Sequence, residues 1–271
     1  MYEEFYGLKE NPFSATPDPQ YLFLGNNHRE ALARMVYGIR ERKGFILITG
    51  EVGIGKTILV RYLLGNIDKG QNGVIRTALV FNPKLAAVNF LQYILRDLGV
   101  TVREKSKGDY LRYLNEFLLQ AYEKGEKVVL IVDEAQGLKP GMLEEIRLLS
   151  NLETAKSKLL QIILVGQPEL KKTLSRPEFR QLKQRINLRF HIPPLTEEET
   201  RAYIEKRVTV ARGKEPLFTA EAVHEIFLRS KGIPRLINML CDNALLDGFV
   251  AGKKAIDESL VKDAADDLEL S

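Results

Sequence analysis

Eight consecutive residues, Gly50-Glu-Val-Gly-Ile-Gly-Lys-Thr57, have the types and spacing of a phosphate-binding loop. Glycines let the backbone bend around an anion, so that successive N–H groups point at phosphate oxygens. Lys56 would bring a positive charge to the β and γ phosphates, and the Thr57 hydroxyl is a ligand for Mg²⁺. The residues expected to contact a bound nucleoside triphosphate are Gly50, Glu51, Val52, Gly53, Ile54, Gly55, Lys56, Thr57 and Ile58.

A second candidate follows some eighty residues later, where the apolar run Lys127–Val132 leads into Asp133 and Glu134. Ligands of α/β sheets bind at the carboxyl ends of the strands, which is where this pair would lie. Asp133 is expected to hold Mg²⁺ through water, and Glu134 to polarise the attacking water. If the phosphate loop were a coincidence, both acids would be ordinary solvated loop residues.

The elements that must position these residues alternate between short apolar runs and longer helical patterns. The expected strands are Phe45–Thr49, Val74–Phe81, Lys127–Val132, Leu160–Val165 and Leu188–Ile192. The expected helices between them are about Lys56–Asn66, Ala86–Leu98, Tyr110–Glu123 and Met142–Asn151. This alternation predicts an α/β fold with a parallel sheet covered on both faces.

After Pro193-Pro194 the pattern becomes wholly helical. Thr196 and Glu199 have capping-box spacing, which predicts a helix start. The expected helices are about Glu197–Ala211, Thr219–Ser230, Pro234–Val250 and Asp257–Leu268. We therefore expect an α/β nucleotide-binding core over residues 1–194 and a helical lid over residues 195–271.

Composition narrows the class of protein. The chain has 271 residues, 45% of them hydrophobic, and a net charge of +4, which fits a soluble globular protein and not a disordered one. No apolar run is long enough for a membrane helix, and no secretory signal is visible. Cys241 alone cannot form an internal disulfide, and His28, His191 and His224 lack zinc-ligand spacing. We expect a cytoplasmic protein without an integral membrane segment.

The chain resembles the AAA+ ATPases, and within them the ExeA/GspA-like group (general secretion pathway protein A and its relatives). The motifs that carry this resemblance are Phe5-Tyr-Gly-Leu8, Asn11-Pro-Phe13, Pro17-Asp-Pro19, Thr49-Gly-Glu-Val-Gly53, Asp133-Glu-Ala-Gln136, Gly166-Gln-Pro-Glu-Leu170, Gln184-Arg-Ile186 and Gly232-Ile-Pro-Arg-Leu-Ile-Asn238. The resemblance implies a P-loop NTPase core with a five-stranded parallel sheet, followed by a small helical lid. It also implies an ATP hydrolase.

The resemblance further suggests roles for residues outside the two motifs. Gln167 matches the position that senses the γ-phosphate, where Asn or Thr is commoner. Arg235 matches a second sensor at the start of a lid helix; an ordinary surface salt bridge is the alternative. Asn82 matches a position that restrains the catalytic glutamate, although Asn-Pro is also a good turn. Tyr21 or Phe23 would line an adenine pocket unless both are core residues.

A cluster of basic residues lies in the segment Arg176–Arg189. By the resemblance, Arg185 is the first choice for an arginine finger that reaches a neighbouring subunit, with Arg180 second and Arg189 third. A finger acting between subunits implies a homo-oligomer, expected to be a ring of about six. The alternative is a basic stripe that faces solvent or nucleic acid.

Three classes of function stay open at this point. The ExeA-like alternative is an ATPase that acts with protein components of an envelope or secretion machinery, at the inner face of the cell membrane through a partner or a C-terminal region. The second is a DNA-binding regulatory ATPase similar to the transposition proteins TniB and TnsC. The third is a nucleotide-loaded scaffold that assembles without turnover.

Overall fold

The computed structural model describes residues 1–14, 19–67, 73–81, 85–103, 106–155, 157–212 and 216–270. The chain divides into two compact units. The sheet unit comprises His28–Gly50 and Leu59–Ile192. The helical unit comprises Met1–Asn27, Glu51–Ile58 and Pro193–Ser271. Packing thus groups the first 27 residues with the last helices, whereas the domain boundary at residue 194 stays a prediction.

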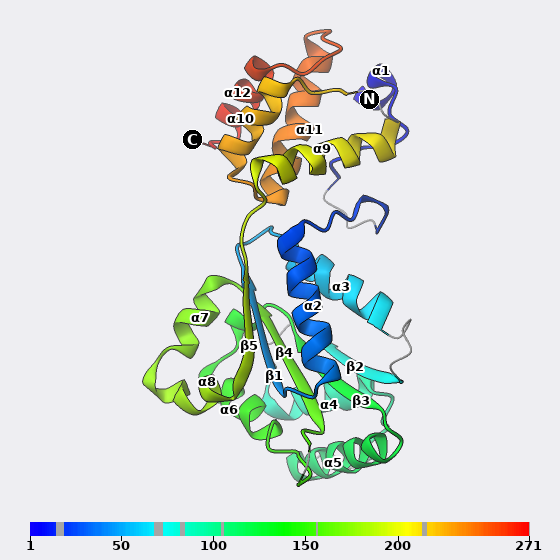
Figure 1. The fold of residues 1–271 in the computed structure, drawn as a ribbon, viewed down its shortest axis with the longest axis vertical. Coiled ribbons are helices and arrows are strands. Elements are labelled where there is room, and N and C mark those ends of the chain that lie inside the picture. The colour runs from blue at the N-terminus through cyan, green and yellow to red at the C-terminus, as the bar shows by residue number, and fades with distance from the viewer. Residues whose placement is uncertain are drawn as a thin grey trace. The chain divides into compact units, whose positions relative to one another are not determined.

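The sheet unit is built on five strands in the order β2-β3-β4-β1-β5 (Figure 1). The strands are β1 (Phe45–Gly50), β2 (Ile75–Val80), β3 (Lys127–Val132), β4 (Leu160–Gly166) and β5 (Ile186–Ile192). Every neighbouring pair is parallel, and Ile162 of β4 pairs with both Phe45 of β1 and Leu130 of β3. The predicted five-stranded parallel α/β sheet is confirmed.

Helices cover both faces of the sheet (Figure 1). One face carries α2 (Asn26–Arg40) and α3 (Lys56–Asn66). Gly38 of α2 lets this helix approach closely, because a Cβ there would lie 2.5 Å from Cδ1 of Ile46. The other face packs against α4 (Ala87–Asp97), α5 (Lys107–Glu123) and α6 (Pro140–Leu149).

Burial distinguishes the central strands from the edge strands. In β1 and β4 every residue is buried, and in β3 only the first residue is partly exposed. Strands covered on both faces require such continuously apolar sequences. The edge strand β5 alternates instead, and it exposes Asn187, Arg189 and His191. Gln161 of β4 is a polar exception in the centre of the sheet: it is fully buried, and its Oε1 accepts the Gly44 N–H at 2.8 Å.

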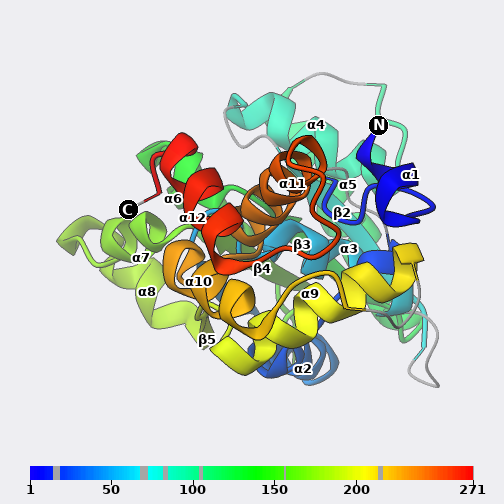
Figure 2. The same ribbon diagram turned by 90° about the horizontal axis from the view of Figure 1, so that it is seen from above.

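The helical unit gathers α9 (Glu197–Arg212), α10 (Ala220–Ser230), α11 (Pro234–Val250) and α12 (Glu258–Asp267), which Figure 2 shows from above. Local sequence fixes where these helices begin. Thr196 and Glu199 exchange two hydrogen bonds of 3.2 Å, so the predicted capping box is present at α9. Thr219 and Asp257 cap α10 and α12 by accepting backbone N–H groups.

The N-terminal segment completes the core of the helical unit. Its short helix α1 (Tyr2–Tyr6) buries both terminal tyrosines among α11 and α12 residues, and Phe13 joins the same cluster. The Lys9 N–H donates to the Ala211 carbonyl of α9 at 2.8 Å. The helical unit therefore draws on both ends of the chain.

Among the described residues, four α-helices were not predicted from the sequence: α1, α2, α7 (Pro168–Leu174) and α8 (Arg180–Arg185). The apolar spacing in α2 is visible afterwards, because Ala31, Met35 and Ile39 recur every four residues and are all fully buried. By contrast, α7 and α8 have seven and six residues, too short for periodicity to be informative.

Candidate nucleotide-binding site

Two sets of site residues start from the carboxyl end of the same sheet. Gly50 is the last residue of β1, and Asp133 follows directly after β3. Only β4 lies between these parallel strands, so the two strands are about 10 Å apart across the sheet. The phosphate loop and the acidic pair therefore leave the sheet at the same end, where α/β folds place their ligands.

The phosphate loop has the backbone that its glycines predict. Gly53 and Gly55 adopt φ angles of 81° and 99°, in the region that side chains disfavour. Lys56 is the first residue of α3 and is almost completely buried, and its Nζ donates to the Glu51 carbonyl at 2.8 Å. The N-terminus of this 11-residue helix presents backbone N–H groups and a positive dipole end, both suited to an anion.

Gly53 also makes close contact with α11 inside the helical unit. The N–H of Arg235 donates to the Gly53 carbonyl at 3.3 Å. A Cβ at Gly53 would lie only 2.5 Å from the Cβ of Arg235. Arg235 is the second residue of α11 and its side chain is exposed. The structure therefore brings the predicted second sensor against the phosphate loop.

The two acids differ in their surroundings. Asp133 is 1% exposed, and its Oδ1 accepts the N–H of Glu134 at 2.9 Å. Glu134 is exposed and has a φ of 53°, a left-handed conformation that is uncommon outside glycine. Strained backbone of this kind is frequent at functional sites. A buried carboxylate and an exposed carboxylate on a strained backbone suit different tasks.

Glu134 lies within a small polar network in the sheet unit. Its Oε2 accepts hydrogen bonds from the side-chain amides of Gln136 and Gln167, the second at 3.4 Å. The N–H of Gln167 donates to Oε1 of Gln136 at 3.0 Å. The structure thus joins the predicted sensor Gln167 to Glu134. Sequence reasoning missed Gln136, whose signal was an amide two residues after the acidic pair.

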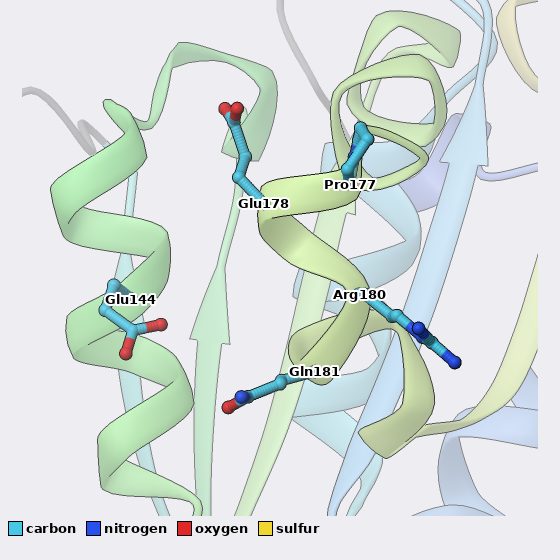
Figure 3. A pocket seen from close by; sticks show the side chains of 5 residues that line it. All are labelled: Glu144, Pro177, Glu178, Arg180 and Gln181. Atoms are coloured by element: carbon cyan, nitrogen blue, oxygen red, sulfur yellow. The ribbon is translucent and has the colours of Figure 1, made fainter.

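The three candidate finger residues differ in exposure. Arg185 ends α8 and is partly buried, and its Nη1 donates to Ser150 Oγ at 2.9 Å. Arg189 is exposed and donates to the Lys183 carbonyl. Arg180 is exposed at an open hollow of about 380 Å³ between α6 and α8. Figure 3 shows Gln181 pointing toward α6 and Arg180 pointing away from it.

Two further predictions concern the nucleotide pocket. The Tyr21 ring is buried in the core of the helical unit, and its hydroxyl donates to Glu10 at 2.8 Å. Phe23 packs edge-on against Tyr203 in the same core. Both rings therefore belong to the core, which is the alternative that the sequence left open. Asn82, Pro17 and Asp18 lie outside the described residues.

The family follows from comparison with known proteins. The AAA domain family matches residues 39–174, so the chain belongs to this family. In the part of the chain that the structure describes, no helix is both long and apolar enough to cross a membrane.

Within this class, the chain is similar to general secretion pathway protein A of Aeromonas hydrophila, with 43% identity over 258 residues. The match covers 94% of this chain and 46% of the relative, so the chain spans about half the length of that protein. The resemblance to the ExeA/GspA-like group that the sequence motifs predicted is therefore confirmed.

Solved structures agree on the fold. The Aeropyrum pernix ORC2 protein, in ADPNP-ADP complexes, matches with a TM-score of 0.66 at 19% identity, over 95% of this chain and 71% of that one. The Thermotoga maritima RuvB Holliday junction branch migration motor matches with a TM-score of 0.60 at 18% identity, over 92% and 71%. The chain thus has the AAA+ fold, a P-loop NTPase core with a helical region after it.

Proposed function

We propose that this chain binds ATP with Mg²⁺ and hydrolyses it. The observation that carries the proposal is the placement of a phosphate loop after β1 and an acidic pair after β3, at one end of one parallel sheet. Membership of the AAA domain family supports the same function. The backbone of Gly50–Ile58 would hold the phosphates, with Lys56 at the β and γ oxygens.

The donor chemistry available for Mg²⁺ fits that ion. Thr57 supplies a hydroxyl and Asp133 a carboxylate, and Mg²⁺ commonly takes one or two protein oxygens together with phosphate and water. When bound, the ion would neutralise charge on the transferring phosphate. The buried position of Asp133 keeps its carboxylate fixed, which suits a ligand better than a proton acceptor.

Glu134 is proposed as the general base. Its exposed side chain at the end of β3 can accept a proton from water, whereas the buried Asp133 is less accessible. Gln167, through its bond to Glu134, would detect the γ-phosphate. Arg235, through its contact with Gly53, would report the state of the nucleotide to α11.

The first experiment removes the charge of the phosphate loop. Lys56→Ala should abolish ATP binding in calorimetric titration at millimolar nucleotide and Mg²⁺, because the β and γ phosphates lose their cation. Lys172→Ala is the matched control, since this lysine is exposed on α7. Unchanged ATP affinity in a folded Lys56→Ala variant would refute the phosphate-loop assignment.

We further propose a homo-oligomer, a ring of about six, in which Arg185 completes the neighbour's site. Arg185 would have to leave Ser150 to reach that site. A finger contributes about 10³–10⁵-fold to turnover. Mixing Arg185→Ala with Glu134→Gln subunits should restore activity that neither has alone. No restoration, with Arg180→Ala and Arg189→Ala tested in the same way, would exclude a finger acting between subunits.

The cellular role follows the relative's name and is proposed on that basis. The named protein is a general secretion pathway component, and this chain is 43% identical to it over 258 residues. We propose that ATP turnover here drives assembly or remodelling in an envelope or secretion machinery, with the chain in the cytoplasm near the inner membrane face. Co-purification of envelope components that depends on ATP and fails with Lys56→Ala tests this role.

A DNA-directed regulatory ATPase is the second candidate, favoured by one observation. Four basic side chains on and around α7 and α8 are exposed: Lys171, Lys172, Arg176 and Arg180. Such a cluster can neutralise phosphates, and affinity would then fall steeply as salt rises. Duplex binding that weakens by orders of magnitude between low and moderate salt, and that these four substitutions remove, would favour this candidate. Absence of binding at low salt would exclude it.

A further inference from the structure

The orientation of the Gln136 side-chain amide is determined by its neighbours. The Gln167 backbone N–H can only donate, so the group that faces it must be the carbonyl oxygen of Gln136, at 3.0 Å. The NH₂ group of the same amide is then directed at Glu134, whose Oε2 accepts from it. Exchanging the two ends of the amide would break both bonds.

Gln136 occupies a closely packed place between the ends of β3 and β4. It lies in the short 3₁₀ turn Ala135–Gly137, directly after the acidic pair. At Gly166, the last residue of β4, an added Cβ would lie 2.9 Å from Oε1 of Gln136 and 3.3 Å from its backbone N. A larger residue at 166 would displace the amide. The site therefore includes a glycine that leaves room for Gln136.

The two amide donors act on one oxygen of the carboxylate. Gln136 and Gln167 both donate to Oε2 of Glu134. In the part of the chain that the structure describes, no hydrogen bond reaches Oε1. Glutamate side chains have considerable rotamer freedom, which an exposed residue retains unless something restrains it. The two amides therefore fix the carboxylate and direct its other oxygen toward solvent.

We propose that Gln136 is a positioning residue for hydrolysis: it holds Oε2 of Glu134 so that Oε1 accepts the proton of the attacking water. This rests on the proposed ATPase function, with Glu134 as general base. Gln136 itself would contact neither the nucleotide nor the attacking water. It acts through Glu134, in the way that preorganised side chains keep reacting groups in productive geometry.

The test is Gln136→Met, which keeps the length of the side chain and removes both ends of the amide. We expect kcat to fall about 10- to 100-fold, the size of a lost hydrogen bond to a charged group, while the KM for ATP stays within about twofold because no nucleotide contact changes. Gln120→Met is the matched control, since Gln120 is exposed on α5. It should leave both constants unchanged.

A double-mutant cycle separates positioning from general structure. In the Glu134→Gln background, Gln136→Met should cause no further loss in the residual single-turnover rate, because the group that it positions is gone. An additive loss, a parallel fall in ATP affinity, or wild-type kcat in Gln136→Met would overturn the inference. If Gln136→Met does not fold, Gly166→Ala provides a second test, because its Cβ would lie 2.9 Å from Oε1 of Gln136 and displace the amide. Its loss of kcat should also disappear in the Glu134→Gln background.

Failure of the inference can be told apart from failure of the proposed function. If the wild-type chain does not hydrolyse ATP under conditions in which it assembles, the function itself is wrong. If the wild type hydrolyses ATP and Glu134→Gln does not, but Gln136→Met is as active as wild type, only the positioning role is wrong.

Discussion

Each unit contains a polar network, and the two differ in exposure and charge. In the sheet unit, Glu134 is exposed, strained and bonded to two neutral amides. In the helical unit, Arg207 is 7% exposed and has neutral partners on several sides. Its Nε donates to the Pro12 carbonyl at 2.6 Å, its Nη1 donates to Tyr203 and Asn238, and its guanidinium lies 5.0 Å from the Tyr21 ring centroid.

The difference shows how burial separates a chemical role from a structural one. A buried charge is tolerated only when its hydrogen bonds are satisfied, so the Arg207 network stabilises one arrangement of the N-terminal segment and α9. Burial also raises the pKa of Tyr203, and its hydroxyl donates to Asn238 at 2.8 Å. An exposed carboxylate stabilises little, but it remains able to exchange a proton.

The largest expected effect concerns turnover. Glu134→Gln should lower kcat by about 10²–10⁴-fold, the usual contribution of a general base, while leaving ATP affinity and Tm unchanged because the side chain is exposed. Steady-state ATPase rates, calorimetry and thermal unfolding measure the three quantities. A fall of several degrees in Tm would show that the Glu134 network stabilises the fold. That result would contradict the difference drawn between Glu134 and Arg207.

The second prediction concerns the buried Arg207 network of the helical unit, where the expected loss is in stability. Arg207→Met should lower the free energy of unfolding by about 3 kcal/mol, since it removes the guanidinium with its hydrogen bonds and leaves buried acceptors unpaired. Urea unfolding followed by circular dichroism gives the value, and Arg201→Met, exposed on the same helix, is the control. Stability equal to wild type would mean that the Arg207 network contributes nothing net.

The third prediction concerns Gly53, where the phosphate loop meets α11. Gly53→Ala should lower the free energy of unfolding by about 1–3 kcal/mol, because alanine disfavours a φ of 81° and its Cβ would collide with Arg235. Gly65→Ala in α3 is the matched control: nothing lies within 4 Å of that position, and a helical alanine should stabilise by about 0.5–1 kcal/mol. Equal effects at both glycines would contradict the contact.

The smallest expected effect is at the start of α12, where Asp257 caps the helix. Asp257→Ala should lower the free energy of unfolding by about 1 kcal/mol at pH 7. Asp263 is exposed on the same helix, and Asp263→Ala should lower it by less. The hydrogen bond from Lys253, with those from Ser259 and the Leu260 N–H, holds the pKa of Asp257 below its ordinary 3.8. Because this folded-state pKa is depressed, the stabilisation is present above pH 4.

Below that pH the same stabilisation is lost, as Asp257 becomes protonated on approach to its folded-state pKa. Urea unfolding of wild type and Asp257→Ala between pH 2 and 7 measures the effect, and the two stability curves should converge toward the acid end of this range. A difference between them that stays constant across the range would contradict the assignment.

The sequence predicted features that depend on local pattern. The central strands β1 and β3 contain continuous apolar runs, the phosphate loop has fixed glycine spacing, and the Thr196–Glu199 box is complete within four residues. These properties need no knowledge of distant contacts. The five-stranded sheet and the helical region after it could therefore be predicted before the structure was known.

Features that depend on distant pairs were missed. Arg207 is one of many arginines until Pro12 and Asn238 are brought to it. Gln136 is one of several glutamines in the sequence, and its role depends on Gln167, which follows the end of β4. Edge strand β5 was predicted two residues too short, because its alternating pattern gives a weak signal at its first residues.

The contribution of both chain ends to the helical unit has a consequence for biosynthesis. Tyr2, Tyr6 and Phe13 are synthesised well before the helices that bury them, α9 to α12. At about 5–20 residues per second the delay is on the order of ten seconds or more. For that time the aromatic side chains lack their native partners, so the nascent chain exposes an apolar segment of the kind that chaperones bind.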